Sequence, residues 1–242
     1  MAAEYDATRG GVARARAAAR DVAGYLPAGD ALEIGVGTGI VAEALLREAP
    51  QVRTLVGVDI SAEMLKRARQ RLPGSVLRAS AQRMPFPDSQ FHGVVAVHVL
   101  HVVSDLTATL VEAARVLRPR GRMVAIHGEP EHPDDDLSEA VRGLRAVRSS
   151  RPDSPEAVRS AADETGLRCV WQHSTSPRTT HHSPAELADL ISNRSWSHLW
   201  ALDEAEWRTH VVPALEALHA LPDQHRPRVQ EARMTLTVLE NP

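Results

Sequence analysis

Three glycines spaced two residues apart, Gly35, Gly37 and Gly39, form the stretch best suited to bind a small polar molecule. They follow an apolar run and precede the helix-forming residues 41–46, a pattern that predicts a buried strand, a tight turn and a helix start. Glycine has no Cβ to keep a ligand from the backbone, and a helix N-terminus offers unpaired N–H groups and a favourable dipole. We therefore expect a ligand here, although a turn that needs positive φ and binds nothing gives the same pattern.

Histidines occur at three places suited to base catalysis. His98 and His101 follow the fourth predicted strand, and His127 ends the fifth. Ligands of parallel sheets bind at the carboxyl ends of the strands, and imidazole titrates near neutral pH, so these histidines are candidate bases. His127 is the preferred base, with His101 second and Glu129 as an alternative. Each of them can instead line a pocket without taking part in catalysis.

A metal site is not expected. His181 and His182 are adjacent in an extended segment, so their side chains face opposite ways. No cysteine or carboxylate cluster completes a ligand set around them.

Composition narrows the function classes. The 242 residues carry a net charge of −3, which offers no basic surface for nucleic acid. The single cysteine, Cys169, cannot form an internal disulfide and fits the reducing cytoplasm. No signal pattern and no apolar stretch long enough to span a membrane is present, so neither secretion nor membrane insertion is expected.

Strand and helix patterns alternate along the chain, which predicts parallel strands joined by helical crossovers in a doubly wound sheet. Apolar runs predict strands over residues 31–34, 54–59, 75–79, 93–97, 122–126, 167–173 and 234–239. Helical spacing predicts helices over 8–26, 40–49, 61–69, 105–117, 137–148, 156–165, 184–191 and 203–221.

Five motifs occur in a characteristic order between Ala31 and Ile126. They are Glu33-x-Gly35-x-Gly37-x-Gly39, Gly57-Val58-Asp59 with Met64-Leu65, Met84-Pro85-Phe86-Pro87-Asp88-x-x-Phe91, Val99-Leu100-His101-Val102, and Arg115-Val116-Leu117-Arg118-Pro119-x-Gly121. Together they resemble the class I S-adenosylmethionine-dependent methyltransferases, in particular the small-molecule branch similar to the ubiquinone/menaquinone methyltransferases.

The resemblance implies S-adenosylmethionine as cofactor and S-adenosylhomocysteine as product. Glu33 would order the glycine turn and bind the cofactor's ammonium group, directly or through water. Asp59 would accept hydrogen bonds from both ribose hydroxyls. The alternative is that Asp59 is a carboxylate in a surface turn and binds no ligand. Ile60 and Met64 would sandwich the adenine, and His98 would line the pocket.

Two further positions follow from the same resemblance. Ser80-Ala81-Gln82 stands where the family often has an Asp-Ala-Glu-like triplet, and Ser80 can still accept a hydrogen bond from the adenine amino group in place of the acid. Tyr5 with Asp6 resembles a lid over the cofactor carboxylate, or else belongs to a disordered tail.

The resemblance also implies a seven-stranded, mostly parallel Rossmann-like sheet with an antiparallel last strand. We expect one domain over residues 1–242. It divides into an N-terminal lid and helix (1–27), a cofactor-binding core (28–127), acceptor-pocket helices with the sixth strand (128–232) and the last strand (233–242). Trp196, Trp200 and Trp207 lie in the region that covers the acceptor pocket in this family, as pocket walls or as helix-packing core.

The implied activity is methyl transfer by in-line displacement to an oxygen, nitrogen or carbon of a small molecule, by a cytoplasmic monomer or homodimer. One alternative is a protein that binds the cofactor without transferring methyl. A nicotinamide oxidoreductase is less favoured, because its Gly-x-Gly-x-x-Gly fingerprint is not met where Ile40 follows Gly39. The acceptor itself is not identified.

Overall fold

The chain was analysed in a computed structural model, which describes all residues except 1–5, 7–9, 132–134, 149–151 and 201. The chain divides into two compact units where one domain was expected. The core unit comprises Met1–Gly128, Pro152–Ser176 and Met234–Pro242, and the helical unit comprises Glu129–Arg151 and Pro177–Arg233. Of the segment 128–232, expected to hold the acceptor-pocket helices and the sixth strand, residues 129–151 and 177–232 lie in the helical unit, whereas residues 128 and 152–176 lie in the core unit.

In the part of the chain that the structure describes, the sheet has eight strands, seven of them in the order β3-β2-β1-β4-β5-β8-β6, with β7 paired to β8. Neighbouring strands from β3 to β5 are parallel, whereas β6 and β7 run antiparallel to β8. This confirms the predicted doubly wound fold and adds the short strand β7. The strands are β1 Gly29–Ile34, β2 Val52–Asp59, β3 Val76–Arg78, β4 Phe91–Val97, β5 Leu117–Glu131, β6 Arg168–Ser174, β7 Arg178–His182 and β8 Arg228–Glu240.

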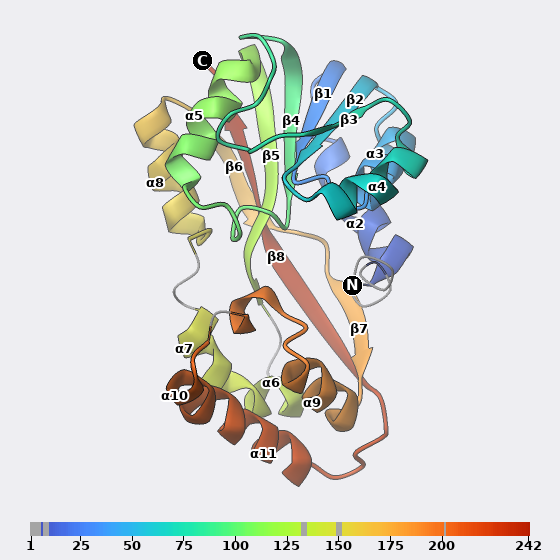
Figure 1. Ribbon diagram of the computed structural model, residues 1–242, viewed down its shortest axis with the longest axis vertical. Helices are drawn as coiled ribbons and strands as arrows, with labels where there is room; N and C mark the ends of the chain where they lie inside the picture. The colour runs from blue at the N-terminus through green and yellow to red at the C-terminus, as the bar shows by residue number, and fades with distance from the viewer. Residues whose placement is uncertain (1–5, 7–9, 132–134, 149–151, 201) are drawn as a thin grey trace. The chain divides into compact units, whose positions relative to one another are not determined.

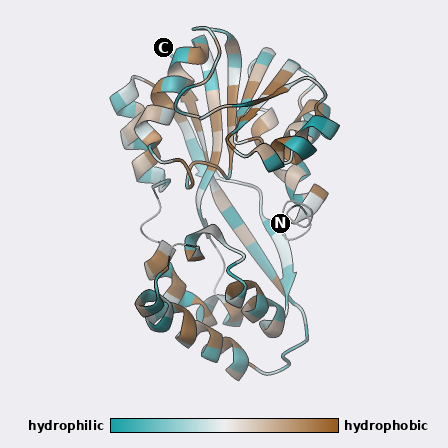
Figure 2. Cartoon of the chain, viewed as in Figure 1, coloured by the Kyte–Doolittle hydropathy of each residue, from teal (hydrophilic) through white to brown (hydrophobic). Residues whose placement is uncertain are grey.

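Helices of the core unit cover both faces of its sheet (Figure 1). They are α2 Gly11–Ala23, α3 Ile40–Glu48, α4 Ala62–Arg71, α5 Leu106–Val116 and α8 Pro155–Thr165. Successive residues of each inner strand join opposite hydrophobic clusters: Ala31 packs with α2, α3 and α4, whereas Leu32 packs with α5 and α8. Both faces are therefore buried, and Figure 2 shows hydrophobic residues in the strands and in the helices beside them.

Local sequence signals set several helix boundaries. The Ser61 hydroxyl caps α4 by accepting from the backbone N–H of Met64, and the Asp105 carboxylate caps α5. The helix expected over 137–148 is instead α6 Asp136–Ala140, a 3₁₀ turn (Arg142–Leu144) and α7 Arg145–Arg148. Gly143, a poor helix former, lies within that turn.

The helical unit has its own apolar core, which includes Leu137, Ile191 and Leu218. Its remaining helical segments are α9 Pro184–Ser192, a 3₁₀ turn over Ser197–Leu199, α10 Glu204–Glu206, the π-helical turn Trp207–Val211 and α11 Val212–Ala220. The predicted helix over 203–221 is thus continuous but changes hydrogen-bond pattern ahead of Pro213, which has no N–H to donate.

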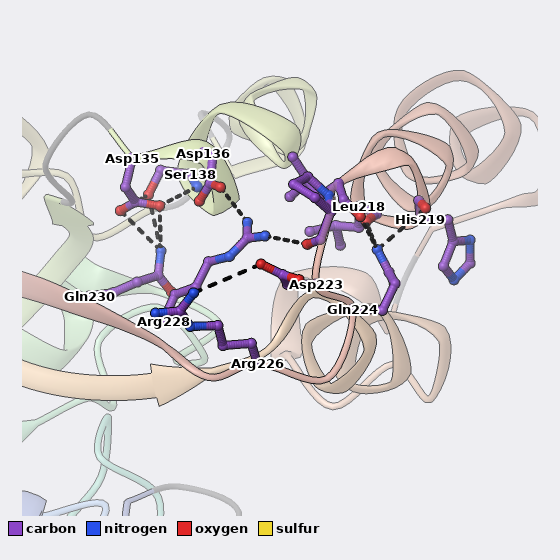
Figure 3. A network of polar contacts seen from close by, with 12 residues as sticks. Asp135, Asp136, Ser138, Leu218, His219, Asp223, Gln224, Arg226, Arg228 and Gln230 are labelled. Atoms are coloured by element: carbon purple, nitrogen blue, oxygen red, sulfur yellow. Dashed lines mark hydrogen bonds and ion pairs between the residues drawn. The ribbon is translucent and has the colours of Figure 1, made fainter.

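A polar network ties the start of β8 to α6 within the helical unit (Figure 3). The Gln230 side chain donates to the carboxylate of Asp135, which caps α6, and Arg228 pairs with Asp136. Arg228 also donates to the carbonyl oxygen of Pro222, at 2.6 Å. These contacts hold the start of β8 against α6 inside the helical unit. No helix of the described residues is long and apolar enough to cross a lipid bilayer.

Two of the five sequence motifs meet in the core unit around Arg115. Its guanidinium donates to both carboxylate oxygens of Glu112 (2.7 and 2.8 Å) and to the carbonyl oxygens of Met84 and Phe86. Glu112 also accepts from the backbone N–H of Met84, and the Arg115 hydrogen bond is the main reason its pKa lies below the usual range. The loop that contains Pro85 and Pro87 is thereby held on helix α5.

We expect Glu112→Gln to destabilise the chain by about 2 kcal/mol, because a buried charge-assisted contact to Arg115 is lost. The Glu112 carboxylate stabilises the folded chain above its unfolded pKa, and this stabilisation is lost as pH falls through the lower folded pKa. The stability of the Glu112→Gln variant should therefore decrease less on acidification than that of the natural chain. Urea unfolding between acidic and neutral pH measures both effects. Asp88→Asn, which removes an exposed partner of the same arginine, is the control and should cost much less; equal costs would contradict the role of burial.

Candidate cofactor site at the carboxyl edge of the sheet

The glycine loop adopts the backbone that its sequence predicts. Gly35, Gly37 and Gly39 all have positive φ, of 69°, 54° and 79°. A Cβ at Gly35 would lie 2.3 Å from Cγ2 of Val99, so the loop after β4 packs directly on this glycine. Helix α3 begins immediately after Gly39, which leaves its first N–H groups at the carboxyl edge of the sheet.

Asp59, at the end of β2, braces this loop. One carboxylate oxygen accepts from the backbone N–H of Gly37 at 2.9 Å, and the other accepts from that of Ser61 at 2.8 Å. The carboxylate is half-buried and lies across from the glycines, where the sequence placed it. Its binding of ribose hydroxyls stays a prediction.

A second set of contacts, made by Asp6 and Arg71, also holds the glycine loop. The Thr38 hydroxyl donates to the carboxylate of Asp6, and Arg71 donates both to that carboxylate and to the carbonyl oxygen of Thr38. Asp6 therefore contacts the glycine loop, as a lid element would. Tyr5, the other predicted lid residue, lies outside the described residues.

Glu33 is a carboxyl group placed to receive a cation. It lies on β1, which pairs with β2 and β4; its side chain is buried, and its Oε2 has no hydrogen-bond partner among the described residues. Burial, and secondarily the charge of Asp59, raises the pKa of Glu33 to about 8. A positively charged ligand group beside it would favour the ionised form, which is what the predicted contact with an ammonium group requires.

The residues predicted to hold adenine lie on the adjacent loops. Ile60 is 67% exposed and Met64 is half-buried, so both retain surface for a flat ring. The Ser80 hydroxyl accepts from the backbone N–H of Gln82, whose side chain donates to Ser104, and Ala81 is half-buried between them. The turn over Ser80-Ala81-Gln82 is therefore formed, but it contains no acidic side chain.

His98 and His101 both lie in the loop that packs on the glycines. His98 has φ of 55°, a left-handed backbone unusual for a residue with a side chain, and donates its N–H to the carbonyl oxygen of Ile126. Such strain clusters at functional sites. His101 is 16% exposed at its side chain, and its Nδ1 lies 3.9 Å from Oδ2 of Asp153.

His127, the preferred base of the sequence analysis, is fully buried and engaged at both ring nitrogens. Its Nδ1 lies 2.8 Å from the carbonyl oxygen of Asp153 and its Nε2 lies 2.8 Å from the hydroxyl of Thr237. Because a carbonyl can only accept, Nδ1 carries the proton and Nε2 accepts from Thr237 in the neutral ring. This geometry suits a structural histidine, and the assignment of a catalytic base to His127 or His101 stays a prediction.

Other candidates fall elsewhere. Glu129 belongs to the helical unit. There Trp207 packs against the apolar core with the Arg194 guanidinium 4.4 Å from its ring, and Trp196 joins the same core. Trp200 is 59% exposed. Among the described residues, no group of His, Cys, Asp and Glu is arranged to hold a metal ion.

A cavity of about 750 Å³ opens at the other end of the strands, away from the glycine loop. Arg120, Arg122, Arg168 and Glu240 line it, and Glu240 forms ion pairs with Arg122 and Arg168. It contains none of the predicted site residues.

A glycine loop braced by one acid, with a second acid buried beneath it at the switch point of a doubly wound sheet, is an arrangement typical of proteins that bind nucleotide-like cofactors. Residues 32–125 match the family model described as a methyltransferase domain. Over this span the chain is similar to methyltransferase domains.

Curated relatives share this half of the chain. The ubiquinone/menaquinone biosynthesis C-methyltransferase UbiE of Desulfotalea psychrophila is 34% identical over 111 residues, 45% of each protein. The demethylmenaquinone methyltransferase of Tropheryma whipplei (strain Twist) is 36% identical over 121 residues, 49% of this chain and 48% of that protein. The match thus spans about half the length of these relatives.

Solved structures share the fold over most of the chain. A geranyl diphosphate methyltransferase in complex with GPP and sinefungin has a TM-score of 0.52 at 17% identity, covering 92% of this chain and 75% of that chain. The [4+2]-cyclase SpnF has a TM-score of 0.51 at 18% identity, covering 92% and 80%. The second example shows that this fold also serves another activity.

Gly35→Ala should move the loop after β4 and weaken cofactor binding. The positive φ costs about 1 kcal/mol, and the contact with Val99 adds about 1–3 kcal/mol. Gly74→Ala is a matched control, because Gly74 has φ of 75° and nothing within 4 Å of an added Cβ. Calorimetry with S-adenosylhomocysteine should show at least about tenfold weaker binding for the first variant alone; similar affinities for both would contradict the close packing.

Glu33→Gln should flatten the pH dependence of stability. The folded pKa of about 8 lies above the unfolded value, so the native state holds a proton that the unfolded state loses. Stability of the natural chain therefore falls as pH rises from about 4.3 to 8, by up to about 1.4 kcal/mol per pH unit, and then levels off. Denaturation across this range measures the slope, with Glu63→Gln on exposed α4 as control. An unchanged slope in Glu33→Gln would show that Glu33 is ionised in the ligand-free protein.

Proposed function

We propose that the chain is an S-adenosylmethionine-dependent methyltransferase that acts on a small molecule. The observation that carries the proposal is the buried Glu33 carboxyl, with an oxygen that lacks a partner among the described residues, beneath a glycine loop braced by Asp59. The family match over residues 32–125 supports the same activity.

Each part of the site would bind a different part of the cofactor. Glu33 would receive the ammonium group, the backbone of the loop from Gly35 to Gly39 would approach the methionine moiety, and Asp59 would accept from the ribose hydroxyls. When bound, the cofactor supplies an electrophilic methyl group on a sulfonium and keeps the electron pair of the broken carbon–sulfur bond. The protein's part is alignment, exclusion of water and, for an acceptor that must lose a proton, a base.

His101 is the base in this proposal. It lies on the loop that packs against Gly35 through Val99, and its side chain is partly exposed. His127 has a structural role in this proposal, since both of its ring nitrogens are engaged.

The acceptor is a small molecule whose methylated atom stays open between oxygen, nitrogen and carbon. The relatives named as quinone-biosynthesis methyltransferases make demethylated quinones the first acceptors to test. We place the reaction in a reducing compartment, because the chain has one cysteine and no pair to form a disulfide.

A cofactor-binding protein that transfers no methyl group is the second candidate. Ser80 stands where the family often has an acid, and the cyclase with the same fold is a precedent for other chemistry. Both candidates require cofactor binding, and only the first forms methylated product.

Calorimetry with S-adenosylmethionine, S-adenosylhomocysteine and NAD⁺ tests the shared premise. We expect binding of the first two and none of NAD⁺; binding of NAD⁺ alone would refute the proposal. Asp59→Asn should weaken S-adenosylhomocysteine binding by about 10–100-fold, since a charged acceptor is lost. Asp30→Asn, which removes a carboxylate at the opposite end of β1, is the control and should have no effect.

Transfer of radiolabelled methyl to a panel of quinones, phenols and amines separates the two candidates. A labelled product from any of these acceptors supports the methyltransferase. Cofactor binding with no labelled product across the panel supports the second candidate.

A further inference from the structure

Asp153 is a fully buried carboxylate that the sequence motifs did not single out. It lies in the short segment before α8, between prolines 152 and 155, and belongs to the core unit. A buried carboxylate is costly unless hydrogen bonds and charges stabilise it. The contacts around the Asp153 carboxylate therefore indicate its role.

The backbone of Asp153 is anchored by the buried His127. The Nδ1–H of His127 donates to the Asp153 carbonyl oxygen, and the Thr237 hydroxyl donates to Nε2. Thr237 in turn accepts from the side-chain amide of Gln172, at 3.0 Å. Gln172 on β6, Thr237 on β8 and His127 on β5 therefore form a series of hydrogen bonds in which each side chain has a defined donor or acceptor role. This series fixes the segment before α8.

The side chain of Asp153 is fixed as well. Its Oδ2 accepts from the backbone N–H of Gly128, at 2.9 Å, where Gly128 has φ of 79°. The same oxygen faces Nδ1 of His101 at 3.9 Å. That distance exceeds a hydrogen bond, but contacts of this kind are often long in ligand-free proteins and tighten when ligands bind.

We infer that Asp153 is a positioning residue for His101: its carboxylate keeps the proton on Nδ1 and turns Nε2 toward the carboxyl edge as the basic nitrogen. The inference rests on the proposed function and deepens it, since it concerns the base of the same site. In the reaction, the proton leaves the acceptor's hydroxyl or amine and moves to Nε2 of His101, and the buried carboxylate stabilises the imidazolium that forms.

The assignment also explains why His127 is buried with both nitrogens engaged. A base must exchange protons, and His127 cannot do so without breaking its contacts with Asp153 and Thr237. Its place in the structure is to hold the residue that orients His101.

Nitrogen NMR of the full, ligand-free chain with labelled histidines tests the pair without any acceptor. His101→Gln assigns the signals of His101 among the 12 histidines. At about pH 8, where imidazole is neutral, the natural chain should show a protonated Nδ1 and an unprotonated Nε2 for His101. A proton on Nε2 instead would overturn the inference, and this measurement requires no variant at Asp153.

Asp153→Asn keeps the acceptor for Gly128 and removes the charge. The Nδ1 signal of His101 should move toward that of an unprotonated nitrogen, while S-adenosylhomocysteine affinity changes less than about threefold. Asp163→Asn, which changes an exposed carboxylate on α8, should alter neither. A folded Asp153→Asn chain with the His101 spectrum of the natural protein would refute the role, whereas loss of S-adenosylhomocysteine binding by the natural chain would refute the proposed function instead.

Discussion

The hydrogen bond from the backbone of Gly37 to the carboxylate of Asp59 is the contact on which the site depends. Three glycines with positive φ cost conformational entropy on folding, so a loop of this kind keeps one shape only if something outside it fixes the backbone. Asp59 does so from the end of the neighbouring strand. The parallel register of β1 and β2 brings the two together, because Glu33 pairs with Gly57, two residues before Asp59.

The same register has an electrostatic consequence. It places Glu33 in a fully buried position near a second carboxylate, and burial together with that charge raises the pKa of Glu33 to about 8. An acid kept protonated at neutral pH is an unfavourable arrangement for stability, and a bound cation relieves it. The fold thus maintains at its carboxyl edge a group that ionises most readily when a positively charged ligand is present.

The sequence was sufficient for the parts of the molecule that depend on local pattern. Alternating strand and helix periodicity predicted the doubly wound sheet, and helical spacing predicted α4 and α5, whose starts the structure shows capped by Ser61 and Asp105. It did not reveal Asp153, because that residue lies in a proline-bounded loop and gains its surroundings only when β5, β8 and α8 come together. The preference for His127 over His101 was based on position at a strand end, which contains no information on whether a side chain is buried.

The helical unit shows a similar limit. Its amphipathic segments predicted helices close to the observed boundaries. The π-helical turn before α11 and the ion pair between Arg228 and Asp136, however, depend on tertiary contacts. Acceptor choice was expected to reside in this part of the chain. All of its residues lie outside the family match over residues 32–125, so the shared domain does not identify the acceptor.

A crystal structure of the chain with S-adenosylhomocysteine is the most direct measurement of the central claim. The account predicts the amino acid portion against the glycine loop with its ammonium group near Glu33, the ribose at Asp59 and the sulfur on the side of the sheet edge that carries His101. A ligand bound away from the glycine loop, or bound there with its ribose away from Asp59, would contradict it.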